Sequence, residues 1–329
     1  MSAVATPTDD DVAAVDERPF TARAAEFVLS QGFIVIFALW AIYLSIATEH
    51  FLTTDNLLLL TRQAAIFSIV GIGTTFVVLL GQLDISFGAV VSLSGCVGAA
   101  WVVGGHHPVV GFAIAILIGV VVGLVNGVLV ARFRIASVVA TLGTLGIVEG
   151  LASIYTSGSS IFGDELDSMS DLYLGKVLGI PVIALVALGL YVVFSVVATR
   201  TRFGAHVYAT GDSEPAAFRA GVRTAWVKLS VFVLAGALAG FAGMLQVARL
   251  GRAQATMGAD FLFPVLTAVI LGGISMHGGK GRLFNTLIAS LFLVSITNGL
   301  ILLGYDSQVQ RVVQGAVLIV AVSLDRLRD

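Results

Sequence analysis

The sequence has few charged residues and a single cysteine. Charged residues make up 12% of the 329 residues and apolar residues 57%. Soluble domains carry roughly 25% charged residues, and the core of a soluble domain cannot bury this many apolar residues. The composition therefore predicts a polytopic membrane protein. The lone Cys96 excludes a disulfide framework and a cysteine-rich metal site. A net charge of −2 and the absence of a long basic run argue against a nucleic-acid binder.

The sequence also lacks the motifs of a nucleotide site or an enzyme. The stretch GGKGR at 278–282 contains Gly-Lys, but Ile274 stands where a phosphate loop needs glycine and Gly281 where it needs Ser or Thr. No Ser/His/Asp or His-Glu-x-x-His arrangement is present, and the histidines show no metal-ligand spacing. We therefore expect no catalytic residue, no metal site and no ATP site in this chain.

Long apolar runs dominate the rest of the sequence. A membrane-spanning helix needs about 20 mostly apolar residues, so we predict an all-α protein of about ten transmembrane helices. The second run contains Arg62 and Gln63, and the tenth contains Arg311; both arginines are expected to reach the headgroups. The candidate spans are 29–48, 57–80, 85–105, 108–131, 135–156, 177–199, 229–248, 261–278, 283–305 and 307–324.

The distribution of Lys and Arg predicts the orientation. With the amino terminus inside, thirteen of the 18 basic residues lie on the inner side and five on the outer side. Both termini are therefore expected to be cytoplasmic. Residues 1–28 lack the features of a signal peptide and are predicted to form a disordered cytoplasmic tail, followed by a membrane domain at 29–324 and a short tail at 325–329.

Two loops are unusually long for a membrane protein. The outer loop at about 157–176 contains the acidic cluster Asp164, Glu165, Asp167 and Asp171. The inner loop at 200–228 is predicted to contain a helix of about two turns, with Asp212 or Ser213 as its N-cap, Glu214 and Pro215 in its first turn and Gly221 as its stop. A solvated connector is the simpler interpretation, but the cap, the stop and the apolar residues Ala216, Ala217 and Phe218 favour a docking helix.

Glycine recurs at two kinds of position. Gly119, Gly123 and Gly127, Gly146 and Gly150, and Gly236 and Gly240 have the four-residue spacing that lets helices pack closely in lipid. Other glycines instead interrupt apolar runs, in the stretches VLLGQLDISFG (78–88) and VILGGISMHGG (269–279). These two stretches align at an offset of 191 residues, which matches Gly81 with Gly272 and Gly88 with Gly279. Broken segments at matching positions of two halves point to the functional region of a transporter.

Polar residues within apolar runs form the remaining candidates. A carboxylate at the bilayer centre costs about 2.5–3.5 kcal/mol on insertion scales, so Asp84 and Glu149 are expected to face a partner or a hydrated cavity. Asn126 and Asn298, each in an Asn-Gly pair, either join helices or line a pathway. The predicted pathway or broken-helix residues are Gly81, Asp84, Asn126, Gly272, Gly273 and Asn298.

The sequence resembles the permease subunits of ribose-type ATP-binding-cassette (ABC) importers for monosaccharides and related small polar solutes. The resemblance extends from about 50 to 326 and is carried by GQLDISFGAVVSLSG (81–95), GLVNGVLVARFRIASVVATLGTL (123–145), ATGDSEPAAFRAGVR (209–223) and LGGISMHGGKGRLFNTLIASL through NGLILLG (271–304). It implies a ten-span permease of the bacterial inner membrane, working with a cytoplasmic ATPase subunit that binds ATP and Mg²⁺. It also implies a second permease, either another copy or a paralogue, with a homodimer as the expected form, and an extracytoplasmic sugar-binding protein.

The resemblance assigns roles to both long loops. The acidic outer loop at 164–171 becomes a candidate docking surface for the binding protein. Glu214, Ala216, Ala217, Arg219 and Gly221 match the motif of the helix that docks into the ATPase. The candidate ATPase-coupling residues are Asp212, Glu214, Ala216, Ala217, Phe218, Arg219 and Gly221.

Four positions depart from the family pattern. Gln82 replaces a second glycine, Ala136 stands where proline is common, Glu149 where a basic residue is common, and the coupling loop reads Gly-Asp-Ser-Glu instead of Gly-Gly-Asn-Glu. These departures weaken an assignment to ribose itself. An ion-coupled secondary transporter that uses Asp84 or Glu149 is the alternative, although it leaves the docking loop without a role.

Overall fold

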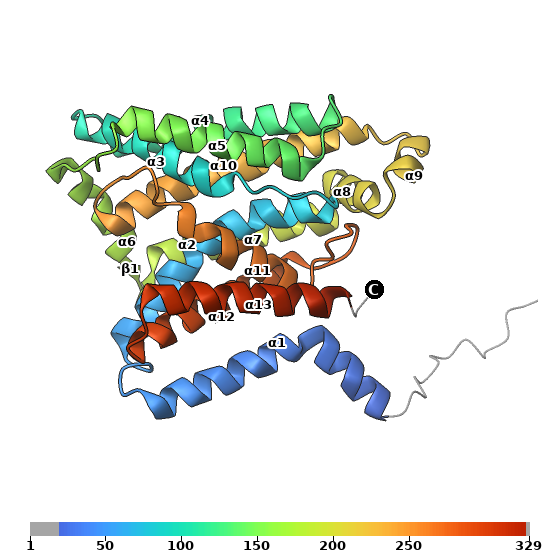
Figure 1. Ribbon diagram of the computed structural model, residues 1–329, viewed down its shortest axis with the longest axis horizontal. Helices are drawn as coiled ribbons and strands as arrows, with labels where there is room; N and C mark the ends of the chain where they lie inside the picture. The colour runs from blue at the N-terminus through green and yellow to red at the C-terminus, as the bar shows by residue number, and fades with distance from the viewer. Residues whose placement is uncertain (1–19, 327–329) are drawn as a thin grey trace, which may run out of the picture.

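The computed structural model describes the backbone of residues 20–326 and the side-chain surroundings of residues 33–323. Helices run roughly along one axis and are joined at two opposite ends (Figure 1). The long elements are α1 (Phe20–Ala47), α2 (Thr54–Leu79), α3 (Phe87–Val103), α4 (Pro108–Ala131), α5 (Ser137–Thr156), α7 (Val182–Arg200), α10 (Thr224–Leu250), α12 (Leu283–Leu302) and α13 (Ser307–Arg326). The short ones are η1 (Asp164–Met169), α6 (Ser170–Leu174), β1 (Lys176–Val177), β2 (Ile180–Pro181), α8 (Arg202–Asp212), α9 (Glu214–Arg219), η2 (Ala259–Phe261) and α11 (Leu262–Leu271).

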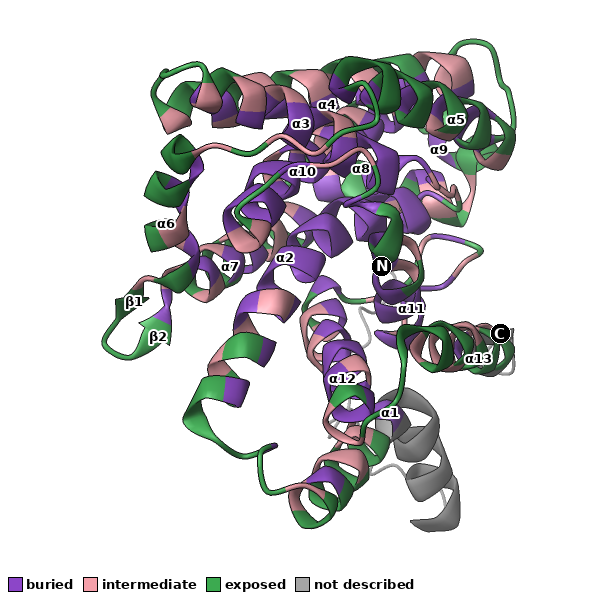
Figure 2. Ribbon diagram, turned by 60° about the vertical axis from the view of Figure 1, so that its left-hand side comes forward, coloured by how far each residue is buried: buried purple, intermediate pink, exposed green. Residues whose placement is uncertain are grey.

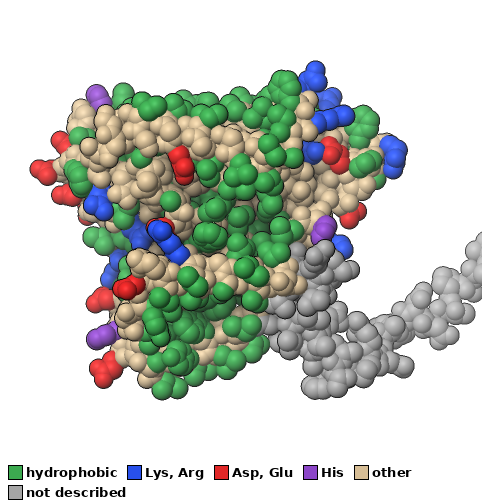
Figure 3. All heavy atoms as spheres, in the orientation of Figure 1, with side chains coloured by type: hydrophobic (Ala, Val, Ile, Leu, Met, Phe, Trp, Pro, Cys, Tyr) green, Lys and Arg blue, Asp and Glu red, His purple; other side chains and the backbone are tan. Residues whose placement is uncertain are grey.

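The two ends of the molecule differ in what they contain. The helices α8 and α9 lie at one end together with the described end of α13 and the start of α1, and α6 and the β1–β2 hairpin lie at the other (Figure 1). Charged side chains gather at these two ends, and hydrophobic side chains cover much of the surface between them (Figure 3). We refer to them as the α9 end and the α6 end. This distribution is that of a polytopic membrane protein.

The core is organised around α10, which packs against α4, α3 and α2 and is buried along most of its length (Figure 2). A Cβ atom added at Gly119 would overlap the carbonyl group of Gly236, and one added at Gly123 would overlap that of Phe232. The predicted close packing is therefore confirmed for the glycines of α4 and α10. Bulky side chains are excluded because these two backbones lie in direct contact.

Six described helices are long and apolar enough to cross a membrane: α2, α4, α5, α7, α10 and α12. The span predicted at 261–278 is wrong as a single helix, because α11 ends at Leu271 after 10 residues, which rise only about 15 Å. The count of ten spans and the cytoplasmic location of both termini stay predictions. The helix α1 already begins at Phe20, so residues 20–28 do not belong to the predicted disordered tail, and residues 1–19 lie outside the described part.

Two segments predicted as loops contain regular structure. Residues 176–181 form the hairpin β1–β2, so the sixth span begins at Val182 and not at 177. The inner loop contains α8 in addition to the predicted helix, and α10 begins at Thr224 and not at 229. The sequence analysis missed α8 because Gly204 and Gly211, which are poor helix formers, both lie within it.

Candidate functional site

The two glycine-interrupted stretches end their helices in the same way. After α2, the N–H of Gly81 donates to the carbonyl of Val78 and the N–H of Gln82 to that of Val77; after α11, Gly273 and Ile274 repeat both bonds. This is the Schellman motif, which requires positive φ at the residue after the cap, and φ is 66° at Gly81 and 83° at Gly273. The predicted breaks are confirmed, but Gly273, not Gly272, is the counterpart of Gly81.

Both breaks meet the end of α8 in a tight junction of backbones. The N–H of Gly279 donates to the carbonyl oxygen of Leu79 over 2.9 Å. A Cβ at Gly211 would overlap that same oxygen, and a Cβ at Gly279 would lie 2.7 Å from Cα of Asp212. A Cβ at Gly278 would lie 2.7 Å from the backbone nitrogen of Gly81. We call the contact among residues 79–81, 211–212 and 278–279 the inner junction.

A side chain of α8 adds a second attachment to the same loop. The hydroxyl of Tyr208 donates to the carbonyl oxygen of Gly281 over 2.9 Å. Burial raises the pKa of Tyr208, and the nearby Arg282 opposes this rise. The hydroxyl therefore keeps its proton, and with it the hydrogen bond, at physiological pH.

The helix α9 forms where the coupling helix was predicted. Ser213, not Asp212, is the N-cap, and its hydroxyl accepts from the N–H of Ala216 over 3.4 Å. Gly221 follows the helix with a φ of 86°. Ala217 faces the protein, whereas Ala216, Phe218 and Arg219 are exposed, Phe218 by 69%. The exposed face thus carries an aromatic ring and a guanidinium group, which suits contact with another protein.

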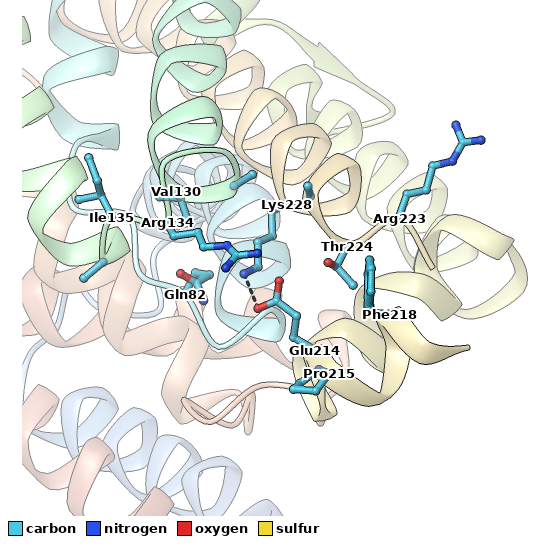
Figure 4. Close-up of a pocket in the computed structure, with 13 residues that line it drawn as sticks. Gln82, Val130, Arg134, Ile135, Glu214, Pro215, Phe218, Arg223, Thr224 and Lys228 are labelled. Atoms are coloured by element: carbon cyan, nitrogen blue, oxygen red, sulfur yellow. Dashed lines mark hydrogen bonds and ion pairs between the residues drawn. The ribbon is translucent and has the colours of Figure 1, made fainter. Parts of the chain in front are cut away.

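An ion pair joins α9 to α10. The Nζ atom of Lys228 lies 2.6 Å from Oε2 of Glu214, and the lysine is buried while the glutamate is half exposed. The pair borders a cavity of about 750 Å³ between α9, the first turn of α10 and the end of α4. Arg134 also points into the space between Lys228 and Gln82, whereas Arg223 points away from it (Figure 4). Besides its chain connections to α8 and α10, α9 is thus held to the membrane domain by this ion pair and by the buried Ala217.

Asp84 belongs to a chain of hydrogen bonds beside the first break. Its Oδ1 accepts from the backbone N–H of Ser86 over 2.8 Å and from its hydroxyl over 2.6 Å. The Ser86 oxygen accepts from Asn126, whose Oδ1 accepts from Thr144 over 2.6 Å. The hydroxyls of Ser137 and Thr141 accept the backbone N–H groups of Leu83 and Ile85, respectively. The extended segment after Gly81 is thereby fixed to α4 and α5.

Asn298 also joins helices. Its amide exchanges two hydrogen bonds with the amide of Asn56, over 2.7 and 3.2 Å, and both side chains are buried. Asn126 and Asn298 therefore both join helices, which is one of the two roles left open for them by the sequence.

The helix α5 turns its glycines outward. A Cβ added at Gly143, Gly146 or Gly150 would meet no atom within 4 Å, and Glu149 on the same helix is exposed. The prediction that Gly146 and Gly150 pack against another helix is wrong among the described residues 20–326, where no other helix covers that face. The exposed Glu149 sits on the same uncovered surface.

The acidic cluster lies on an anchored segment at the α6 end. Asp164, Glu165, Asp167 and Asp171 are all exposed on η1 and α6, which are held by the buried Leu166, Met169 and Tyr173. Arg62 does not reach toward headgroups as predicted. It is buried, donates to the carbonyl of Leu174 over 2.8 Å and lies over the ring of Tyr173, because α6 covers this part of α2.

A second cavity at the α6 end was not predicted. It measures about 230 Å³ and lies among the outer parts of α2, α10, α11, α12 and α13. Gln63 and Arg311 were noted in the sequence only as weaknesses of their spans, yet both line it. The signal that could have found this cavity is the recurrence of glutamine near the same end of separate apolar runs. The glutamines that line it are Gln63, Gln246, Gln310 and Gln314.

Residues 56–322 match the sequence profile of the family described as "Branched-chain amino acid transport system / permease component". The chain is 39% identical over 298 residues to the ribose import permease protein RbsC of Bacillus subtilis, covering 90% of this chain and 92% of the relative. It is 34% identical to the D-allose transport system permease protein AlsC of Escherichia coli, with 90% of both chains covered. It is 32% identical to the L-arabinose ABC transporter permease protein AraH of Azospirillum brasilense, covering 92% of this chain and 89% of the relative. No solved structure matches the chain.

Proposed function

The chain belongs to the family of branched-chain amino acid transport system permease components, and from this premise we propose that it is the permease subunit of a monosaccharide ABC importer. Its relatives named for ribose, allose and arabinose support the sugar class. ATP and Mg²⁺ would bind to a separate cytoplasmic ATPase subunit. The α9 end would face the cytoplasm, in agreement with the excess of Lys and Arg expected there.

The inner junction is the observation that carries this proposal. One connector, α8–α9, touches both broken segments: Gly211 touches the end of α2, and Asp212 touches the loop that follows α11. A force applied to α9 would reach α2 and α11 together through contacts between backbones. Packed backbones transmit a displacement because they cannot be compressed. The exposed Phe218 and Arg219 would supply the contact with the ATPase.

The uncovered face of α5 supports a second permease copy. A carboxylate exposed to hydrocarbon costs about 2.5–3.5 kcal/mol on insertion scales, so Glu149 favours protein or water beside it over lipid. The open space at Gly143, Gly146 and Gly150 lets another helix approach closely. We infer that two copies meet along α5, with Glu149 beside protein or water.

The acidic surface of η1 and α6 is the proposed docking surface for an extracytoplasmic sugar-binding protein. Four exposed carboxylates on an anchored segment can attract a basic patch on a partner and fix its orientation. The permease would then need only weak affinity for the sugar, because the binding protein selects it.

Reconstitution tests the proposed function. Proteoliposomes that contain this chain with an ATPase subunit and a binding protein encoded beside it should accumulate sugar only when ATP is supplied. The chain alone should accumulate none. Accumulation by the chain alone, driven by a proton or sodium gradient, would contradict the proposal and support the ion-coupled alternative through Asp84 or Glu149.

A further inference from the structure

The glutamine-lined cavity at the α6 end has the composition of a sugar site. A glutamine amide offers both donors and acceptors, as a sugar hydroxyl does, and the lining adds the hydroxyls of Thr297 and Ser307. The rings of Phe67 and Phe261, whose centroids lie 4.6 Å apart, form an apolar wall against which the C–H groups of a sugar can pack. Two cations, Arg249 and Arg311, and one anion, Asp260, also line the cavity, and the exposed Arg311 lies 3.6 Å from Asp260.

Part of the polar lining is engaged within the protein, because Gln310 donates to the carbonyl of Tyr305 and Gln314 to the hydroxyl of Thr297. Gln246 is the clearest exception. Its side chain is buried, with 5% exposed, and its Oε1 accepts from Arg249 over 3.4 Å. Its Nε2 donates to no other residue in the described part of the chain, although it lines the cavity. Gln63, which is half-buried on α2, likewise makes no hydrogen bond within that part. Both amides therefore keep hydrogen-bonding capacity that a ligand or water in the cavity can use.

The size of the cavity limits the ligand. Pockets for drug-sized ligands measure roughly 300–1,000 Å³, so a cavity of about 230 Å³ suits a single sugar ring and not an oligosaccharide. Gln246 lies four residues before the end of α10, about 6 Å along the axis. This position places the cavity toward the end opposite to α9.

One wall of the cavity belongs to the element that the inner junction holds. Phe261 and Pro264 lie on η2 and α11, and α11 leads directly to Gly273 and the loop at 278–279. A displacement of α8 can therefore change the cavity through α11. We propose that this cavity is the site within each permease subunit that receives a neutral monosaccharide, with Gln246 and Gln63 as its principal hydrogen-bonding residues. This inference rests on the proposed function and adds where the sugar is bound.

Protection from a thiol reagent tests the site without a transport assay. In the full-length chain with Cys96→Ala, placed in nanodiscs so that both faces are accessible, Ile301→Cys at the rim is labelled with a maleimide. D-ribose, D-allose and L-arabinose at millimolar concentration are the probes, with sodium chloride of equal osmolality as the blank. At least one sugar should slow labelling of Ile301→Cys by several-fold. The control Gln308→Cys is exposed on the next helix, α13, outside the cavity lining, and should not be protected.

Substitutions within the cavity complete the test. Gln246→Leu and, separately, Gln63→Leu should raise the sugar concentration needed for protection about threefold to tenfold, the expected effect of one lost hydrogen bond. Gln308→Leu should not change it. Protection by none of the sugars, equal protection of Gln308→Cys, or unchanged protection in both cavity variants would overturn the proposal. ATP-dependent uptake without protection would refute the sugar site and support the importer function. Protection without ATP-dependent uptake would support the sugar site and refute the importer function.

Discussion

The two ends of this permease are built on opposite principles. At the inner junction, three chain segments meet backbone to backbone, and glycine is required because even a Cβ atom would collide. At the other end, five helices stand apart and leave a cavity lined by flexible polar side chains. Rigidity and binding are thus separated along the axis of the molecule. A displacement would enter through tightly packed backbones, and a solute would bind where side chains can adjust.

The largest effect should come from a side chain forced into the inner junction. Gly211→Val places a branched side chain against the Leu79 carbonyl and Gly279. It should cost about 1–3 kcal/mol of stability, as overpacking does, and lower ATP-driven uptake at least tenfold. Uptake by reconstituted importer is the measurement. Gly189→Val on α7, where added atoms meet open space, is the matched control and should transport normally. Equal uptake by both variants would show that the inner junction accommodates the added side chain.

The ion pair between α9 and α10 should have the next largest effect. Glu214→Gln leaves the ammonium group of the buried Lys228 without its partner and should cost about 1–2 kcal/mol, a value kept low because Glu214 is half exposed. Titration with a denaturing detergent gives the free energy of unfolding. The exchange Glu214→Lys with Lys228→Glu should recover part of the loss. An additive double mutant would show that the two groups do not interact.

Loss of one hydrogen bond on α8 should have a smaller effect. Tyr208→Phe removes the bond to the carbonyl of Gly281 and keeps the ring, so about 0.5–1.5 kcal/mol of stability should be lost. The sugar transported per ATP hydrolysed should fall, while hydrolysis continues. Tyr43→Phe on α1, where the tyrosine is exposed, serves as the control. A larger fall of the ratio in the control variant would contradict the role of α8.

The smallest effect on stability should come from the glutamine-lined cavity. Gln63→Leu removes no hydrogen bond within the described residues and should change the free energy of unfolding by less than about 0.5 kcal/mol. Detergent titration beside Gly211→Val measures the contrast directly. A loss as large as that of Gly211→Val would mean that the cavity is a structural element and would remove the difference between the two ends.

Much of the inner end could be predicted from the sequence. Capping and stop residues are local signals, so Ser213, Pro215 and Gly221 predicted α9, and the interrupted apolar runs predicted both breaks. The meeting of Leu79, Gly211 and Gly279 could not be predicted, because it joins residues far apart in the chain and leaves no periodic pattern.

The α6 end was less predictable for the same physical reason. A glutamine in an apolar run is read as a weakness of one span, and only the arrangement of the helices shows that four such residues line one cavity. Helix spacing alone also could not distinguish Gly119 from Gly146, because spacing identifies a face but not what covers it. Arg62 was misjudged because the covering helix α6 comes from a segment about 110 residues later, the carbonyl being that of Leu174.

If the inner junction controls the glutamine-lined cavity, the labelling rate of Ile301→Cys must respond to an ATP-bound ATPase subunit at the opposite end of the permease. ATP binding should change this rate several-fold in the otherwise unaltered permease, and Gly211→Ala should abolish the change while ATP hydrolysis persists. An ATP-dependent change of equal size in Gly211→Ala, or none in the unaltered junction, would contradict the claim.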